Sequence, residues 1–169
     1  GRIIGDFTVS RLGPEKFQLI ASYSAQAFHM RWFERHLPKK GVEIRNMSLR
    51  RLGFQIAGPK ARELLSRVAD TDVSNAAFPF LTVRRMEVGL APAIVQRVTY
   101  TGDLGYEINV PARFQVALYD ALTDAGRDLG LTPFGMRAMM SLRLEKSFGA
   151  WVREFKPDYT PAETGLDRF

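Results

Sequence analysis

The second half of the 169-residue sequence contains the stretch Tyr100-Thr-Gly-Asp-Leu-Gly-Tyr-Glu-Ile-Asn-Val110, which predicts a turn followed by a strand with two different faces. Two glycines and an acid mark the turn. Side chains alternate along a strand, so Tyr106, Ile108 and Val110 share an apolar face while Glu107 points the other way. Glutamate is disfavoured in strands. Glu107 is therefore either a solvated side chain or a fixed acceptor for paired N–H donors.

Hydrophobic periodicity on both sides of this stretch predicts alternating strands and helices. The expected strands are residues 3–10, 17–22, 49–57, 81–88, 93–100, 106–110 and 131–134. The expected helices are residues 24–37, 59–68, 111–125 and 136–146. This order predicts an α+β fold with antiparallel sheets and a split βαβ unit of ferredoxin-like type.

Composition fits a folded domain and excludes several kinds of chemistry. Of the residues, 46% are hydrophobic, and the longest apolar run, residues 90–95, is far shorter than the ~20 residues of a membrane span. The chain has no cysteine, which excludes disulfides, thiolate metal sites and thiol catalysis, and favours a cytoplasmic or otherwise reducing setting. The net charge is +6, and 18 of the 24 basic residues are arginines, which suits either an anionic ligand or an Arg-rich surface.

Three apparent sites are rejected on chemical grounds. Residues 53–60 imitate a phosphate-binding loop, but Pro59 removes an N–H from the cradle and no Ser or Thr follows Lys60. His29 and His36 are seven residues apart, too far for an i, i+4 metal pair, so we expect no metal site and place both at the surface or at a helix end. The paired arginines 50–51 and 84–85 lie in expected strands, but the aromatic strand of an RNA-recognition module is missing.

Asp6 is the second acidic residue in an unusual place. It follows Gly5 inside the apolar segment Ile3-Ile-Gly-Asp-Phe-Thr-Val9. Because aspartate is a poor strand former, its position favours a functional or a turn role.

These segments together resemble the folate-binding aminomethyltransferase family, which includes the glycine cleavage T protein and the C-terminal portion of dimethylglycine and sarcosine dehydrogenases. The matching motifs are residues 1–9, 58–62, 97–107, 141–146 and 160–166, in the family's order. Residues 28–38 and 142–151 resemble the dehydrogenase branch more than the free-standing T protein. The first residue is not Met, so we expect a fragment of a longer protein.

The resemblance implies a partial form of the family's folate-binding fold. Residues 1–37 would form part of a first folate-binding subdomain, residues 38–149 a ferredoxin-like folate-binding subdomain, and residues 150–169 an extended arm leading to a β domain outside this chain. Pro38-Lys-Lys-Gly41 supplies the first boundary, since it ends the preceding helical pattern.

The resemblance also implies roles for four residues. Asp6 matches the family's catalytic aspartate near N5 and N10 of tetrahydrofolate, and Glu107 matches the glutamate that binds the 2-amino and N3 edge of the pterin. Tyr100 would lie beside the pterin, and Phe80 would form an aromatic wall.

Two positions depart from the T-protein pattern, and both suggest the dehydrogenase branch. Ser22 stands in place of an Asn, and Met139 in place of a folate-binding Arg. Arg137, two residues before Met139, is not assumed to replace that Arg.

The implied activity is tetrahydrofolate-dependent transfer of a one-carbon (aminomethyl or methylene) unit. Its partners would be folate, a one-carbon donor amine and an FAD oxidase domain or subunit, with FAD in a separate domain and no nucleic-acid or membrane partner. The alternatives are a non-catalytic folate-binding or assembly module and, from the basic strands alone, an RNA-binding sheet.

Overall fold

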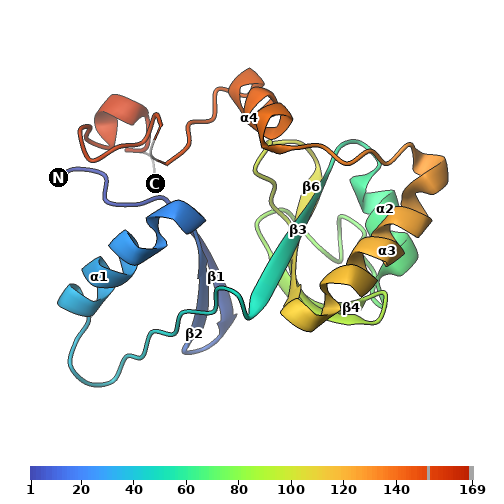
Figure 1. Cartoon of the computed structure of the whole chain (residues 1–169), viewed down its shortest axis with the longest axis horizontal. Helices are drawn as coiled ribbons and strands as arrows, with labels where there is room; N and C mark the ends of the chain where they lie inside the picture. The colour runs from blue at the N-terminus through green and yellow to red at the C-terminus, as the bar shows by residue number, and fades with distance from the viewer. Residues whose placement is uncertain (152, 168–169) are drawn as a thin grey trace. The chain divides into compact units, whose positions relative to one another are not determined.

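The computed structural model describes residues 1–151 and 153–167, which form two compact units (Figure 1). The first unit is Gly1–Asn46 with Ser147–Phe169, and the second is Met47–Lys146. The chain therefore leaves the first unit and later returns to it. The functional subdomain boundaries expected near residues 38 and 150 stay predictions.

The first unit contains a hairpin and a helix. Its elements are β1 (Thr8–Gly13), β2 (Lys16–Ile20) and α1 (Gln26–His36). The expected strand at residues 3–10 is wrong in its first half, because β2 ends at Ile20 opposite Thr8 and leaves residues 3–7 without a pairing partner. Ile3 instead is buried and donates its N–H to the carbonyl oxygen of Tyr159 at 3.1 Å.

His29 is buried on α1, which corrects its expected place at the surface or a helix end. Its ring lies 4.6 Å from that of Phe7, 5.6 Å from that of Phe28 and 5.4 Å from that of Trp151, measured between centroids. Its Nε2 lies 3.2 Å from the carbonyl oxygen of Ile4. His29 therefore anchors the backbone two residues before Asp6.

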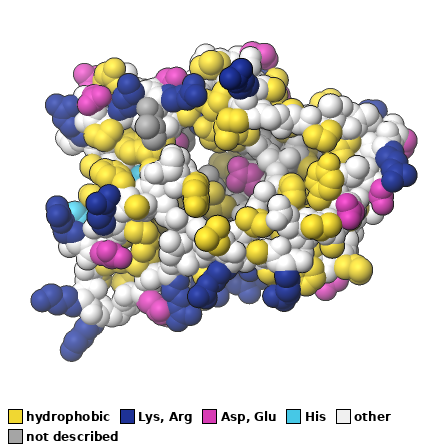
Figure 2. Space-filling model, viewed as in Figure 1, with side chains coloured by type: hydrophobic (Ala, Val, Ile, Leu, Met, Phe, Trp, Pro, Cys, Tyr) yellow, Lys and Arg dark blue, Asp and Glu magenta, His cyan; other side chains and the backbone are white. Residues whose placement is uncertain are grey.

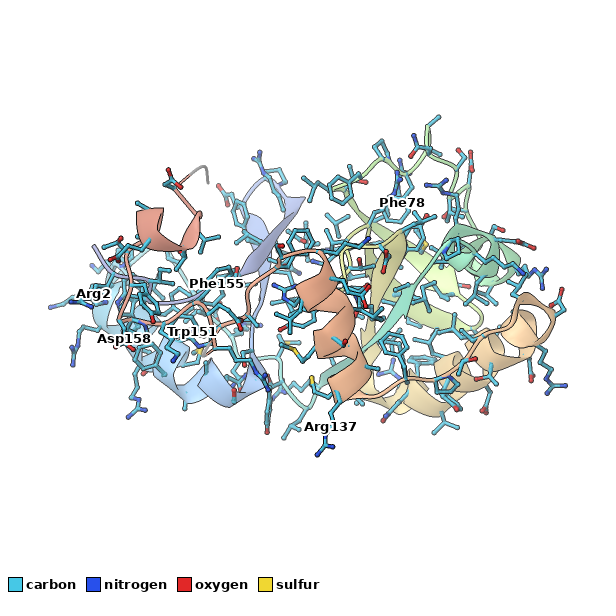
Figure 3. All side chains as sticks on the ribbon, turned by 90° about the horizontal axis from the view of Figure 1, so that it is seen from above. Arg2, Phe78, Arg137, Trp151, Phe155 and Asp158 are labelled. Carbon is cyan, nitrogen blue, oxygen red and sulfur yellow. The ribbon has the colours of Figure 1, made fainter. Side chains whose placement is uncertain are left out.

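The C-terminal segment of the first unit packs against its N-terminal segment. Trp151 and Phe155 form an isolated bridge, and a short 3-10 helix covers Ala162–Thr164. Figure 3 shows the labelled side chains of this segment beside Arg2, whose guanidinium donates to the carbonyl oxygens of Pro157 and Asp158. Both ends of the described chain thus contribute to one unit.

The second unit is a four-stranded antiparallel sheet with helices α2 and α3 packed on one face. Its elements are β3 (Arg51–Ala57), α2 (Ala61–Val68), β4 (Val83–Val88), β5 (Ala91–Gln96), β6 (Gly105–Pro111), α3 (Gln115–Gly126) and α4 (Met136–Glu145). The strand order is β3-β6-β5-β4, so β6 is paired on both edges. Figure 1 places α2 beside α3.

The main core lies between that sheet and α2 and α3. The following side chains, drawn from strands, helices and the connecting segment, are fully buried: Leu65, Phe78, Val88, Val95, Tyr106, Ile108, Val110 and Leu118. The helix expected at residues 59–68 is confirmed as α2, and its residues Ala61, Leu64 and Leu65 are buried in this core.

The α+β class with antiparallel sheets is confirmed, with three local differences. The expected split βαβ unit differs in its strand order. Helix α2 joins the two outermost strands, β3 and β4, and both β6 and β5 lie between them. Strand β5 ends at Gln96, and residues 131–134 form no strand. Pro111 ends β6 and precedes a 3-10 turn, since its ring nitrogen has no N–H to donate. Among the described residues, no helix is long and apolar enough to cross a bilayer.

Replacing Leu65 with Ala is expected to destabilise the second unit by about 2–5 kcal/mol, because it removes a fully buried side chain and leaves a cavity. Urea unfolding followed by circular dichroism measures this loss. Leu90→Ala is the matched control, since Leu90 is 86% exposed. Equal midpoints for the two variants would contradict the described core.

Acidification is expected to destabilise the first unit through His29. Burial lowers the pKa of His29, against a smaller opposing effect of the Ile4 carbonyl. As the pH falls, the unfolded chain therefore takes up a proton on this histidine before the folded chain does. The contribution of neutral His29 to the free energy of unfolding is full above the ordinary histidine pKa and is lost as the pH falls through that value.

Tryptophan fluorescence measures that loss, because Trp32 and Trp151, the chain's only tryptophans, both belong to the first unit. His29→Gln removes the titrating group and is expected to flatten the pH dependence, whereas exposed His36→Gln keeps it. The same pH dependence in wild type and His29→Gln would contradict the assignment.

Candidate pterin-binding face

Glu107 lies in the middle of β6, on the sheet face opposite the core. Its neighbours Tyr106 and Ile108 are fully buried, whereas Glu107 itself is half-buried. In register, Glu107 faces Gln55 of β3 on one side and Gln96 of β5 on the other. Directly opposed side chains of adjacent strands are neighbours. The sheet therefore sets a carboxylate between two carboxamides.

The two carboxamides have different surroundings. Gln96 is 1% exposed, and its Oε1 accepts a hydrogen bond from Asn109 Nδ2 at 3.2 Å. The Nε2 of Gln55 is buried and has no hydrogen-bond partner among the described residues. A buried unpaired N–H is costly, so this site holds an unsatisfied donor next to an acidic acceptor.

Burial raises the pKa of Glu107 above its ordinary value, and the positive charge of Arg143 on α4 acts in the opposite direction. The amides of Gln55 and Gln96 carry no net charge that could offset the burial. The carboxyl group of Glu107 therefore depends on Arg143 for its electrostatic compensation.

Tyr100 lies in the segment that links β5 to β6, and Arg143 covers its ring. The guanidinium carbon of Arg143 is 3.9 Å from the ring centroid, and its Nη1 donates to the carbonyl oxygen of Tyr100 at 2.7 Å. The Tyr100 hydroxyl lies 3.7 Å from Met140 Sδ on the same helix. Tyr100 is thus held by two residues of α4, and one of them, Arg143, also acts on Glu107 by its charge.

Phe80 protrudes from a loop whose backbone is tightly held. The carbonyl oxygen of Phe78 accepts from Arg97 Nη1 at 2.7 Å, that of Pro79 accepts from the Thr82 hydroxyl, and that of Ala77 accepts from Arg84. Leu81, the next residue, has φ +61°, a strained conformation for a leucine.

Despite these restraints, the Phe80 side chain is 66% exposed. It lines a half-open pocket of about 240 Å³ together with Arg97 and residues 102–105, the turn between Tyr100 and β6. Its role as an aromatic wall stays a prediction.

Asp6 belongs to the first unit and is exposed. It lies in a segment without regular structure that is held on both sides: Ile4 contacts His29, and the Phe7 ring packs against His29 and Phe33 at 4.6 and 5.6 Å between centroids. A Cβ on Gly5 would lie 2.4 Å from the Phe7 ring, so glycine is needed for this packing. The backbone at Asp6 is therefore fixed while its carboxylate stays accessible.

Sequence reasoning named Tyr100 and Glu107 but missed Arg143 and Gln55. Alternation along β3 could have indicated Gln55, because it shares the polar face of the sheet. No local pattern signals Arg143, since its contacts join α4 to residues about forty positions away. Within the described ranges, no group of three or more metal-ligating side chains is found. Figure 2 shows Lys and Arg side chains interspersed with hydrophobic ones on the visible face.

Relatives of this chain include dimethylglycine dehydrogenases and aminomethyltransferases. Human mitochondrial dimethylglycine dehydrogenase is 39% identical over the whole of this chain, which spans 20% of that protein. An aminomethyltransferase of Thermoanaerobacter sp. (strain X514) is 30% identical over the whole chain, which spans 46% of it. The chain thus spans about one fifth of the first dehydrogenase relative and less than half of this aminomethyltransferase.

A solved structure has a similar fold. It is the heterotetrameric sarcosine oxidase from Corynebacterium sp. U-96 in complex with pyrrole 2-carboxylate, which superimposes with a TM-score of 0.63 and 21% sequence identity. The matched region covers 80% of this chain and 66% of the sarcosine oxidase chain. The family model for the GCVT N-terminal domain matches residues 1–169. This match over the whole chain shows that the chain belongs to the GCVT N-terminal domain family, the folate-binding aminomethyltransferase family that its motifs resemble.

Proposed function

We propose that this chain binds tetrahydrofolate and carries out transfer of a one-carbon unit to it, as the folate-binding portion of a dimethylglycine or sarcosine dehydrogenase-like protein. The observation that carries the proposal is the fixed position of Glu107 on the polar face of the sheet, between Gln55 and Gln96. Membership of the family and the identities of the relatives support it.

The donors and acceptors at this face fit the edge of a pterin ring. That edge offers two N–H donors, at the 2-amino group and N3, followed by a carbonyl oxygen. The two carboxylate oxygens of Glu107 match the donors. The unpaired Nε2 of Gln55, on the next strand, matches the carbonyl. A ligand with this edge would satisfy the orphaned donor and the acceptor together.

Tyr100 and Phe80 supply aromatic surface for the ligand's rings. The edge and one face of Tyr100 are held by Met140 and Arg143. Phe80 is exposed on its restrained loop. Rigid aromatic side chains contribute contact area at little cost in conformational entropy. We assign Tyr100 to the pterin and Phe80 to a wall of the same ligand site.

Asp6 is the proposed catalytic residue. When bound, tetrahydrofolate supplies the nucleophilic nitrogens N5 and N10 that receive the one-carbon unit. The carboxylate of Asp6 stabilises the positive charge that develops there and accepts the proton leaving N10. The restrained backbone from Ile4 to Phe7 suits this role, because a fixed carboxylate needs little reorganisation during the reaction.

The donor in this proposal is the iminium or formaldehyde product of N-methyl amine oxidation. An FAD domain or subunit outside this chain would make it. The similarity to dimethylglycine dehydrogenase and to sarcosine oxidase subunit alpha of Rhizobium meliloti (strain 1021) supports such a partner.

Replacing Glu107 with Gln is expected to weaken folate binding about 10- to 100-fold, because the amide presents a donor to the pterin amine and removes a charged acceptor. Calorimetric titration with 5-formyltetrahydrofolate measures the affinity. Glu87→Gln is the control, since Glu87 is exposed on β4 of the same sheet. Unchanged affinity of the Glu107 variant would refute the assignment.

The same titration is expected to depend on pH through Glu107. Because burial raises the pKa of Glu107, the carboxyl group takes up a proton above the ordinary glutamate pKa of about 4.3, and affinity falls as the pH is lowered through that raised value. Glu107→Gln is expected to lose this component, whereas the ligand's own protonation is common to both proteins. Parallel pH profiles would contradict the prediction.

Replacing Asp6 with Asn is expected to slow one-carbon transfer about 10²- to 10⁴-fold while sparing folate binding. Formation of 5,10-methylene-tetrahydrofolate from formaldehyde, above the uncatalysed rate, measures the transfer. Glu15→Gln, in the exposed turn of the hairpin, is the control. Folate binding without any rate acceleration by the wild-type chain would favour the non-catalytic folate-binding module instead.

A further inference from the structure

Arg143 contacts Tyr100, and its charge acts on Glu107. Its guanidinium lies over the Tyr100 ring, donates to the Tyr100 carbonyl oxygen at 2.7 Å and attracts the charge of Glu107. The Arg143 guanidinium thus acts in three ways: it stacks on the Tyr100 ring, it donates a hydrogen bond to the Tyr100 carbonyl oxygen, and its charge acts on Glu107. A lysine could supply the charge but neither the planar stack nor the fork of donors.

The end of α4 holds the turn before β6 at a second point. Lys146 Nζ lies 3.2 Å from Asp103 Oδ1, in the turn that follows Tyr100. Such a partly exposed ion pair contributes little by itself. Together with the Arg143–Tyr100 hydrogen bond, it fixes the position of the turn relative to the last part of α4.

The two side chains that face Glu107 across the sheet carry no charge, so the positive charge that acts on Glu107 comes from Arg143. Gln55 on β3 and Gln96 on β5 are uncharged, and Tyr100 contributes a neutral ring. Among the described residues, Arg143 is the one whose positive charge acts on Glu107. Arg137, on the same helix, is exposed and projects away from the body of the structure in Figure 3.

We propose that Arg143 is a positioning residue of the pterin site, which orients the Tyr100 ring through stacking and hydrogen bonding and holds the Glu107 carboxyl group in its acceptor form through its positive charge. This inference rests on the proposed function for its consequence in folate binding. Its effect on Glu107 itself holds whether or not folate is the ligand.

Arg143 also lies on the α4 face that Met139 occupies one turn earlier, since residues four apart share a face of a helix. Met139 stands where the sequence comparison expected a folate-binding arginine.

Titration of the Glu107 carboxyl carbon by NMR in the folate-free chain tests the electrostatic part. The resonance is assigned by its loss in Glu107→Gln. Arg143→Met is expected to move the titration midpoint of Glu107 to higher pH, because burial then acts without compensation. Arg137→Met, the matched control, is expected to leave it unchanged. An identical midpoint in wild type and Arg143→Met overturns the proposal.

Calorimetry with 5-formyltetrahydrofolate tests the consequence for binding. Each pH unit by which the midpoint rises is expected to cost ~10-fold in affinity below both midpoints. Arg143→Met should therefore bind less tightly by a factor that grows as the pH falls. A purely structural loss would lower affinity by the same factor at every pH, and that result would also overturn the proposal.

Arg143→Lys separates charge from geometry and keeps the test valid if Arg143→Met does not fold. It is expected to retain the Glu107 midpoint close to the wild-type value but to bind folate more weakly at all pH values, because the stack on Tyr100 is lost. If the Glu107 titration midpoint in Arg143→Lys were as high as in Arg143→Met, the proposed effect of the Arg143 charge would be contradicted. Absence of folate binding by the wild-type chain would refute the proposed function, while the NMR titration would still decide the effect of Arg143 on Glu107.

Discussion

Strand β6 is hydrogen-bonded on both edges, and its side chains serve both faces of the sheet. Tyr106, Ile108 and Val110 fill the core, and this packing determines the register of the strand against β3 and β5. A slip by one residue would bury Glu107 in the core and expose three large apolar groups. The energy of the core therefore determines where the carboxylate lies, and the binding face needs no separate device to position it.

Burial of the Glu107 carboxylate disfavours its charged form, so a nearby positive charge is needed to stabilise that form. Its sheet neighbours are amides, which can hydrogen-bond but carry no charge. The guanidinium of Arg143, whose charge acts on Glu107, comes from a helix far along the chain and also stacks on the Tyr100 ring. The carboxylate and the charge that compensates it thus come from different elements, so the charge at this face can be changed without disturbing the sheet.

Sequence reasoning identified most strands and helices of the second unit because their periodicity is strong, and it assigned the two faces of β6 correctly. It also expected a strand at residues 131–134, which does not form. It extended the first strand too far because apolar residues 3–5 resemble a strand in composition, whereas strand formation needs a partner that β2 does not provide. It misplaced His29 because a histidine gives no sign of the three aromatic rings that surround it. Arg143 escaped notice because its function depends on contacts distant in sequence.

The division of the chain has a consequence for its synthesis. The second unit is continuous in sequence, from residue 47 to residue 146, so all its contacts become available while translation is still in progress. The first unit needs Tyr159 to pair with Ile3 and Trp151 to pack on His29, and these two residues are synthesised after the whole of the second unit. The segment that carries Asp6 therefore stays incompletely packed until Trp151 and Tyr159 have been synthesised.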